Sequence, residues 1–372
     1  MNVPVNTPSI DDGDIKAVLD CVKSGWVSSQ GPYIESFEKS FADFMDCRYA
    51  ISVANGSAAL DVAIEALRLP KGSEVIIPNF TIFSPAISVI RAGLVPVFID
   101  VNIETCNAEV ETILSAVNKN TSAIIVVHTY GLTTDTEELI NQIKGTQIRI
   151  IEDCAEAHGI RTKSGKRVGA LADISTFSFY PNKLITTGEG GMVITNDASI
   201  IQGIRELRNI GFSEDLPRYQ HTWLGYNYRM TSMQAALGSS QLKKVENHLT
   251  RKYKIGEKYN EAFEKFDTKY LFLPPTELNG SKNSYWIYGI RFSTESEKQK
   301  FQKYLSDNKI GNRDYFYPLH LQPALKERNF RVHDNSTNTI ELSKTGIYIP
   351  SGLGITDEQQ EYVIQKIQNY FK

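Results

Sequence analysis

One stretch in the middle of the chain decides how the rest of the sequence is interpreted. From residue 177 to residue 191 it reads FSFYPNKLITTGEGG. A short apolar run ends here, the hydroxyl of Ser178 lies five residues before Lys183, and a glycine-rich turn follows. An ordinary surface lysine has charged and periodic polar neighbours, and Lys183 does not. Because a cofactor aldehyde needs one rigidly held, reactive amine, we predict that Lys183 forms a Schiff base with pyridoxal phosphate (PLP).

Length, charge and cysteine content indicate a large protein of a reducing compartment. The 372 residues allow one large and one smaller domain, and the formal net charge is -3. This near-balance gives no support for nucleic-acid binding. The four cysteines form no CxxC pair, so we expect neither disulfides nor a metal site. The first residues lack a signal-peptide profile and no apolar run approaches the ~20 residues that span a bilayer, so we expect a cytoplasmic protein with no membrane partner.

Short apolar runs alternate with amphipathic segments between about residues 49 and 200. Most of these runs are almost continuously apolar, which is typical of strands buried on both faces of a parallel sheet. Helices are expected between them, for example at Ser57–Arg68 and from near Pro85. We therefore predict an α/β sheet domain. The expected strands are Tyr49–Val53, Glu74–Pro78, Val95–Val101, Ala123–His128, Ile148–Glu152, Ile174–Phe179 and Met192–Thr195.

The pattern changes after about residue 240. Lys243–Lys265 predicts one long, charged helix. A strand, a helix, a short strand and a closing helix are expected after it, at Tyr285–Phe292, Ser296–Asn308, Ile347–Pro350 and Asp357–Phe371. We predict a large α/β domain at residues 1–245 and a smaller α+β domain at residues 246–372.

A small-residue turn follows the first expected strand and precedes a helix. It contains Asn55, Gly56, Ser57 and Ala58. Free backbone N–H groups and the helix dipole favour an anion at such a place, so the turn could hold a phosphate. A plain helix cap with no ligand explains the same residues. The glycines from Gly188 to Gly191 precede a strand, whereas a dinucleotide fingerprint follows one, so a nicotinamide dehydrogenase is disfavoured.

Two acids lie at and beyond the end of another expected strand. Asp153 follows the apolar run directly, and Glu156 lies three residues further on. Parallel sheets bind ligands at the carboxyl ends of their strands, so Asp153 could hold the pyridine nitrogen of PLP protonated. The alternative is that Asp153 caps a following helix, with Glu156 at the capping-box offset. Ser178 could bind the phosphate, or it could be a buried serine bonded to the backbone.

The order of these elements resembles that of the DegT family of sugar-nucleotide aminotransferases, which are fold type I PLP enzymes. The resemblance covers nearly the whole chain and implies a mainly parallel seven-stranded sheet with a smaller C-terminal domain. The Lys183 and Asn227 segments are its most specific parts. The matching segments are Ser24–Val27, Asn55–Leu60, Glu152–Ala157, the Lys183 segment, Gly225–Thr231 and Tyr317–His320.

The resemblance implies roles for the cofactor-binding residues. Lys183 would carry PLP and move the proton between cofactor and substrate carbons, and Asp153 would pair with the pyridinium nitrogen. Backbone N–H groups of Ser57 and Ala58, together with the Ser178 hydroxyl, would bind the phosphate. The remaining two are placed on either side of the ring: Glu156 would pack against it, and Ile82 stands where many relatives have a stacking aromatic residue.

Other matched positions imply a shared site and substrate contacts. Asn227 would reach the phosphate of the cofactor in a neighbouring subunit, which makes a homodimer the minimal active unit. Tyr317 and His320 could contact the sugar or the amino donor. Arg229 could bind a carboxylate or the nucleotide phosphates, because arginine suits planar anions.

The Lys183 segment is most similar to the subgroup that aminates GDP-4-keto-6-deoxymannose at C4, with glutamate as donor, to give GDP-perosamine for a surface polysaccharide. The same chemistry on a UDP- or dTDP-linked 4-keto sugar stays open, as does a non-catalytic PLP-binding paralogue. Relatives that dehydrate their substrate have histidine in place of the lysine, so Lys183 disfavours that branch.

Overall fold

The computed structural model describes residues 1–213, 215–217 and 219–372. A seven-stranded sheet forms the centre of the larger domain, and its strand order is β1-β7-β6-β5-β4-β2-β3. The strands are β1 (Tyr49–Val53), β2 (Glu74–Pro78), β3 (Val95–Ile99), β4 (Thr121–Val127), β5 (Arg149–Asp153), β6 (Ile174–Ser178) and β7 (Gly191–Thr195). The predicted α/β fold with a mainly parallel seven-stranded sheet is confirmed, and every predicted strand of this domain forms within two residues of its expected bounds.

Only β7 runs antiparallel to its neighbours in this sheet. Its first residue, Gly191, pairs with Val53 at the end of β1 and with Ser178 at the end of β6. A Cβ atom on Gly191 would lie 2.5 Å from the carbonyl oxygen of Asn55, so the chain needs glycine there. This register places Ser178 and the turn after β1 at the same edge of the sheet.

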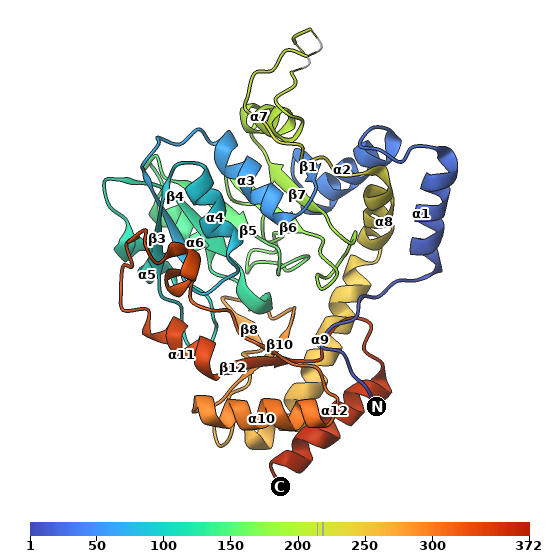
Figure 1. Ribbon diagram of the computed structural model, residues 1–372, viewed down its shortest axis with the longest axis vertical. Helices are drawn as coiled ribbons and strands as arrows, with labels where there is room; N and C mark the ends of the chain where they lie inside the picture. Colours follow the sequence, from blue (N-terminus) through green and yellow to red (C-terminus); the bar gives the residue numbers. More distant parts are fainter. Residues whose placement is uncertain (214, 218) are drawn as a thin grey trace.

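Helices cover both faces of the sheet (Figure 1). One face packs on α3 (Gly56–Ala66), α4 (Ser84–Arg91) and α7 (Ala198–Arg208). The other face packs on further helices and on residues such as Trp286. Those helices are α2 (Pro32–Met45), α5 (Val110–Ala116), α6 (Thr136–Gln142), α8 (Ser232–Leu242) and the 3-10 turn η1 (Thr129–Gly131). Helix α1 (Asp12–Ser24) lies outside this layer, against α8.

The part of the chain proposed as the smaller domain contains nearly all of the long helix α9 (Val245–Phe263) and a three-stranded antiparallel sheet of order β10-β12-β11. Its strands are β10 (Tyr288–Arg291), β11 (Arg313–Asp314) and β12 (Gly346–Ile349), with a hairpin of β8 (Glu277–Leu278) and β9 (Ser281–Lys282). Its helices are α10 (Glu295–Asp307), α11 (Thr337–Thr345) and α12 (Asp357–Tyr370), with 3-10 turns η2 (Glu264–Phe266), η3 (Leu319–Leu321) and η4 (Pro323–Leu325).

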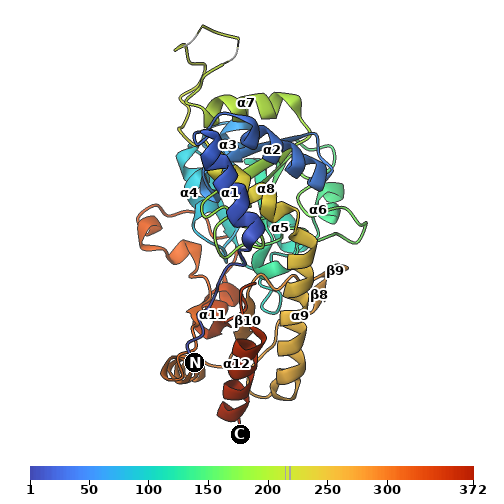
Figure 2. The same cartoon turned by 90° about the vertical axis from the view of Figure 1, so that its right-hand side faces the viewer.

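Two segments join the domains. Val3 bridges to Ile310 and belongs to the apolar cluster of the smaller domain, so the N-terminus lies there (Figure 2). Val332 bridges to Phe98 in β3, which holds the stretch before α11 against the larger domain. The predicted division into domains of residues 1–245 and 246–372 stays a proposal, and these two segments cross it. Among the described residues, no helix is both long enough and apolar enough to span a membrane.

Candidate active site

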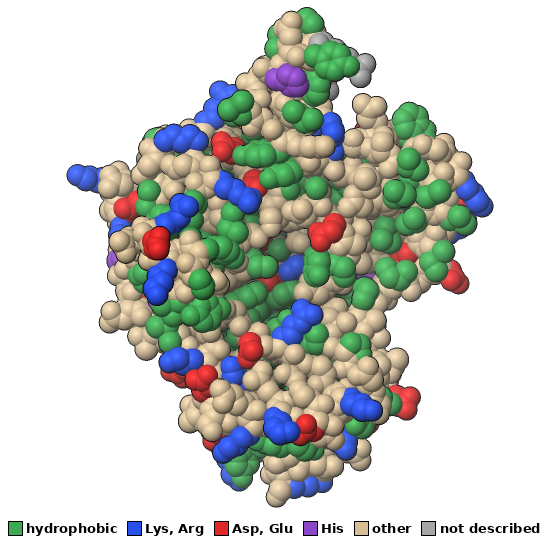
Figure 3. Space-filling view, in the orientation of Figure 1, with side chains coloured by type: hydrophobic (Ala, Val, Ile, Leu, Met, Phe, Trp, Pro, Cys, Tyr) green, Lys and Arg blue, Asp and Glu red, His purple; other side chains and the backbone are tan. Residues whose placement is uncertain are grey.

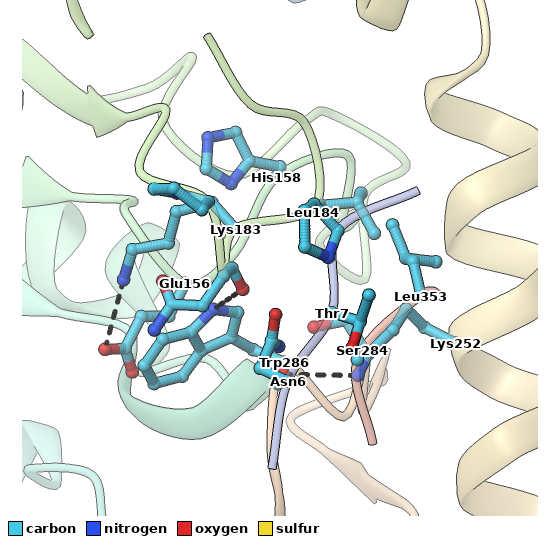
Figure 4. A pocket seen from close by; sticks show the side chains of 14 residues that line it. Asn6, Thr7, Glu156, His158, Lys183, Leu184, Lys252, Ser284, Trp286 and Leu353 are labelled. Atoms are coloured by element: carbon cyan, nitrogen blue, oxygen red, sulfur yellow. Dashed lines mark hydrogen bonds and ion pairs between the residues drawn. The ribbon is translucent and has the colours of Figure 1, made fainter. Parts of the chain in front are cut away.

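Lys183 lies in the loop between β6 and β7, and its side chain is 10% exposed. Its Nζ atom is 3.6 Å from Oε1 of Glu156 and 3.9 Å from the centre of the Trp286 ring. Figure 4 shows the lysine pointing towards the glutamate, with the indole beside both. The structure therefore brings together Lys183 and Glu156, two of the predicted site residues, and their roles stay predictions.

Burial sets the electrostatics of this pair. Loss of hydration lowers the pKa of Lys183, although the carboxylates of Glu156 and Asp153 partly offset the effect. The same loss raises the pKa of Glu156 to about 7, against the opposing charge of Lys183. An amine whose pKa is lowered can both accept and release a proton near neutral pH, which suits acid–base chemistry at this position.

Asp153 is the last residue of β5, at the carboxyl edge of the sheet. Its Oδ1 atom accepts a hydrogen bond from the backbone N–H of Ala155 at 3.1 Å, and burial raises its pKa. Turns, and no helix, follow the strand at residues 154–159, so the alternative of a helix cap with Glu156 is wrong. A buried carboxyl whose charge costs free energy is suited to pair with a cation such as a protonated pyridine.

The turn before α3 forms a polar cradle at the same edge. Asn55 caps the helix, and its side chain accepts the N–H of Ala58 at 2.8 Å. Of the two backbone amides that the resemblance assigns to the phosphate, that of Ala58 is thus engaged in the helix cap. Ser57 lies at the helix start with its hydroxyl 2.7 Å from that of Ser84. A Cβ on Gly56 would lie 2.7 Å from the Cβ of Ser178, so Ser178 lies directly against this turn.

Several residues at the site carry no local signal in the sequence. Trp286 comes from the smaller domain, and its indole N–H donates to the carbonyl of Asn182 at 2.8 Å. The backbone N–H of Tyr130 donates to Oε2 of Glu156 at 2.8 Å, and the Tyr130 ring stacks on Trp286. His158 is buried against the rings of Phe177 and Phe179, and burial lowers its pKa to about 3. Only three-dimensional packing reveals these contacts.

The predicted ring-facing and substrate residues lie at or near the surface. Ile82 is 52% exposed in the loop between β2 and α4, and Tyr317 is 51% exposed. His320 is half-buried, and its Nδ1 atom is 2.6 Å from the side-chain nitrogen of Asn79. Asn79 follows β2 and also accepts the backbone N–H of His320. This clamp holds His320 at the carboxyl edge of the main sheet.

The Asn227 segment is held by two stacked rings. Tyr226 and Tyr228 lie parallel, with centres 4.6 Å apart and planes at 5°. The hydroxyl of Tyr228 donates to the buried Asp61 at 3.0 Å. Asn227, between them, is exposed. Arg229 points elsewhere, because its guanidinium donates to Asn209 at 2.8 Å.

One buried group of metal-ligating residues lies behind Asp153. It consists of His128, Glu152 and Cys154. The His128 ring is already 3.1 Å from the Glu152 carboxylate, and burial raises the pKa of the Cys154 thiol well above its usual range. A thiol that stays protonated is a poor metal ligand. The chemistry of this group does not favour a metal ion there, and the absence of a metal stays a prediction.

Comparison with known proteins identifies the class of enzyme. The chain belongs to the DegT/DnrJ/EryC1/StrS aminotransferase family, which matches residues 8–368. It is therefore a PLP-dependent aminotransferase.

The chain is also similar to individual proteins of known activity. The chain is 38% identical over 371 residues to the GDP-perosamine synthase of Vibrio cholerae, covering 99% of each protein. It is 36% identical over 369 residues to that of Escherichia coli O157:H7, covering 99% of this chain and 98% of the relative. A similar solved structure is an E. coli GDP-4-keto-6-deoxy-D-mannose-3-dehydratase with bound hydrated PLP, with a TM-score of 0.90, 26% identity and coverage of 98% and 99%.

Proposed function

We propose that this enzyme transfers the amino group of glutamate to C4 of GDP-4-keto-6-deoxymannose and so produces GDP-perosamine. The observation that carries the proposal is full-length similarity to two GDP-perosamine synthases, together with a buried lysine at the carboxyl edge of the sheet. The solved dehydratase shares the fold, but the resemblance associates dehydration with histidine at the position of Lys183. The reactive amine favours amino transfer.

The residues of the site fit PLP. Asp153 would hold the pyridine nitrogen, because a buried carboxyl with a raised pKa is stabilised by a cation. The helix start at Ser57 and the adjoining Ser178 hydroxyl would hold the phosphate. Ala58 could contribute only if its N–H leaves the side chain of Asn55. Ile82 and Glu156 are proposed to lie on either side of the ring.

Lys183 is proposed as the catalytic acid and base. The bound cofactor supplies an electron sink that weakens the bonds at the amino-bearing carbon. Lys183 would take the proton from that carbon of the amino donor and deliver a proton to a carbon of the cofactor, and it would act in the reverse sense when the sugar is aminated. Its lowered pKa suits both roles. Glu156 is close enough to stabilise the protonated amine, since their charged atoms are 3.6 Å apart.

A homodimer is proposed as the active unit. Asn227 is exposed between two anchored tyrosines, so its side chain is available to a second subunit. Leu224 nearby is 99% exposed, and α1 exposes Ile15, Leu19 and Val22, as expected for surfaces that a partner covers. We also propose a cytoplasmic location, where glutamate and nucleotide sugars are both available.

An assay with purified protein tests the substrate. GDP-, dTDP- and UDP-linked 4-keto-6-deoxy sugars are incubated separately with glutamate and PLP, and the products are identified by mass. The proposal expects an amino sugar chiefly from GDP-4-keto-6-deoxymannose, together with 2-oxoglutarate. Preferential amination of a UDP- or dTDP-linked sugar would reject the nucleotide assignment, and no amination of any substrate would reject the activity. Release of ammonia with loss of the C3 hydroxyl would indicate dehydration.

A further inference from the structure

The sheet of the smaller domain turns one face to the active site. Figure 1 shows this sheet between the larger domain on one side and α10 and α12 on the other. Ile347 and Ile349 of β12 belong to the cluster on the helix side. Tyr348, between them, packs against the cluster that contains Tyr130 and Trp286. Because side chains alternate along a strand, the Tyr348 face is the one directed at the catalytic residues.

Arg313 lies on the same face as Tyr348. The two residues are direct partners across the antiparallel pair of β11 and β12, so their side chains project to the same side. Their side chains also interact, since the Arg313 guanidinium lowers the pKa of Tyr348 against the larger effect of burial. The adjacent Asp314 projects the other way and pairs with Lys298 on α10 at 2.9 Å.

Tyr348 lies between Arg313 and the residues around Lys183 and Glu156. Tyr130 and Trp286 belong to the apolar cluster against which Tyr348 packs, and they contact Glu156 and Lys183 respectively. The charge of Glu156 is close enough to affect the ionisation of Tyr348. Figure 3 shows basic side chains beside the hollow between the two domains.

A second arginine on this face, Arg291, already has a carboxylate partner. Arg291 pairs with Glu341 at 3.2 Å, and its guanidinium lies over the ring of Phe272. By contrast, no carboxylate of the described residues lies within ion-pair distance of Arg313, which is exposed. Arg229, the arginine that the sequence suggests, is engaged with Asn209. Of these three arginines, Arg313 contacts the Tyr348 side chain but has no carboxylate partner among the described residues, so its guanidinium can receive an anionic group.

We propose that Arg313 binds an anionic oxygen group of the substrate, either a carboxylate of the amino donor or the diphosphate of the nucleotide sugar. The inference deepens the proposed function and rests on it. A guanidinium presents paired N–H donors that match both carboxylate and phosphate. Placement on the smaller domain would tie the position of that domain to the presence of substrate.

Calorimetric titration of the PLP-loaded enzyme tests this subsite without turnover. The probes are glutarate, which has both carboxylates of the donor but no amino group to react, and GDP. We expect Arg313→Met to weaken binding of at least one probe by roughly 10- to 100-fold, the usual loss for one charge-assisted pair. Arg313→Lys keeps the charge but not the planar fork, and should fall between. The matched control is Arg251→Met, since Arg251 is partly exposed and already pairs with Asp357.

The pattern of losses identifies the anion. A loss for glutarate alone supports the donor carboxylate, a loss for GDP alone supports the diphosphate, and a loss for both supports alternating occupancy in the two half-reactions. Wild-type binding of both probes by a folded Arg313→Met protein overturns the proposal. Because neither probe is aminated, the glutarate titration does not depend on which keto sugar is the substrate. A wrong nucleotide assignment would instead appear as weak binding of GDP to the wild-type enzyme, which is distinct from a loss caused by Arg313→Met.

Discussion

The indole ring of Trp286 lies against the amine of Lys183, 3.9 Å from Nζ to the ring centre, although the two residues belong to different domains. The same indole donates its N–H to the carbonyl of Asn182, the residue before the lysine. Trp286 thus holds both the backbone and the side chain of the lysine segment. This relationship connects the position of the smaller domain to the geometry of the reactive amine.

Replacement of this tryptophan should loosen the lysine segment. Trp286→Phe keeps an aromatic ring but removes the N–H donor and leaves the Asn182 carbonyl without this partner, which should cost roughly 1–3 kcal/mol. We expect lower stability of the apoenzyme in urea and faster amide exchange at residues 183–185. Trp26→Phe is the control, because Trp26 is 48% exposed. Equal protection of residues 183–185 in wild type and Trp286→Phe would contradict the holding role.

Removal of the lysine should abolish amino transfer without unfolding the protein. Lys183→Ala lacks the amine that binds the cofactor aldehyde and carries the proton, so we expect turnover to fall by several orders of magnitude. The visible absorption of lysine-bound cofactor should be lost, while circular dichroism stays that of wild type. Lys39→Ala, an exposed lysine on α2, should behave as wild type. Measurable turnover by Lys183→Ala would show that another group acts as the base.

The pH dependence of stability should report on Glu156. Burial raises its pKa from 4.5 to about 7, so between these values the folded apoenzyme binds a proton that the unfolded chain releases. The contribution of this side chain is therefore fully present at low pH and falls as pH rises. Since glutamine does not titrate, Glu156→Gln should gain stability relative to wild type across this range, by up to about 3 kcal/mol.

Urea unfolding of the two apoproteins at several pH values measures this difference. The exposed Glu35→Gln serves as the matched control and should show no such trend. If the difference between Glu156→Gln and wild type does not change with pH, the carboxyl titrates in its ordinary range and the raised pKa is wrong.

Much of the fold is readable from the chain because strands buried on both faces leave continuous apolar runs, as in β2 and β4. Predicted strand boundaries are wrong where one residue adopts a backbone conformation that a strand does not allow. A strand was expected from Tyr285, but that residue has a φ of 48°, so β10 begins only at Tyr288. Helix α1 was not predicted, since its apolar side chains Ile15 and Leu19 face outwards and leave no core-facing stripe.

Some residues of the candidate site can be recognised in the sequence, and others cannot. Asp153 and Ser178 can be recognised because each ends a strand, and the carboxyl ends of parallel strands meet at one edge. Trp286 and Arg313 could not, because they reach the site only through the packing of one domain on the other. Residues of this second kind have no local motif, and their part in function depends on the domain interface.

The proposed sharing of the active site between two subunits makes a prediction that does not depend on the identity of the sugar. Lys183→Ala and Asn227→Ala homodimers should both be inactive or strongly impaired. If Asn227 acts in the site of the neighbouring subunit, a mixed dimer contains one site with both mutations and one site with neither. Unfolding and refolding the two variants together at equal amounts should then restore ~25% of wild-type turnover, because half of the dimers are mixed and each has one intact site.

The refolded mixture discriminates between the two placements of Asn227. If this residue served its own subunit, every site in a mixed dimer would carry one mutation, and no recovery would occur. A mixture of Lys183→Ala with Tyr219→Ala controls for activity gained by refolding alone. Both subunits of this mixture keep Asn227, so only the Lys183→Ala mutation removes active sites. The turnover of this control mixture should follow the share of subunits that retain Lys183. Turnover of ~25% in the Asn227→Ala mixture, absent from either of its two variants refolded alone, would require a site built from two chains.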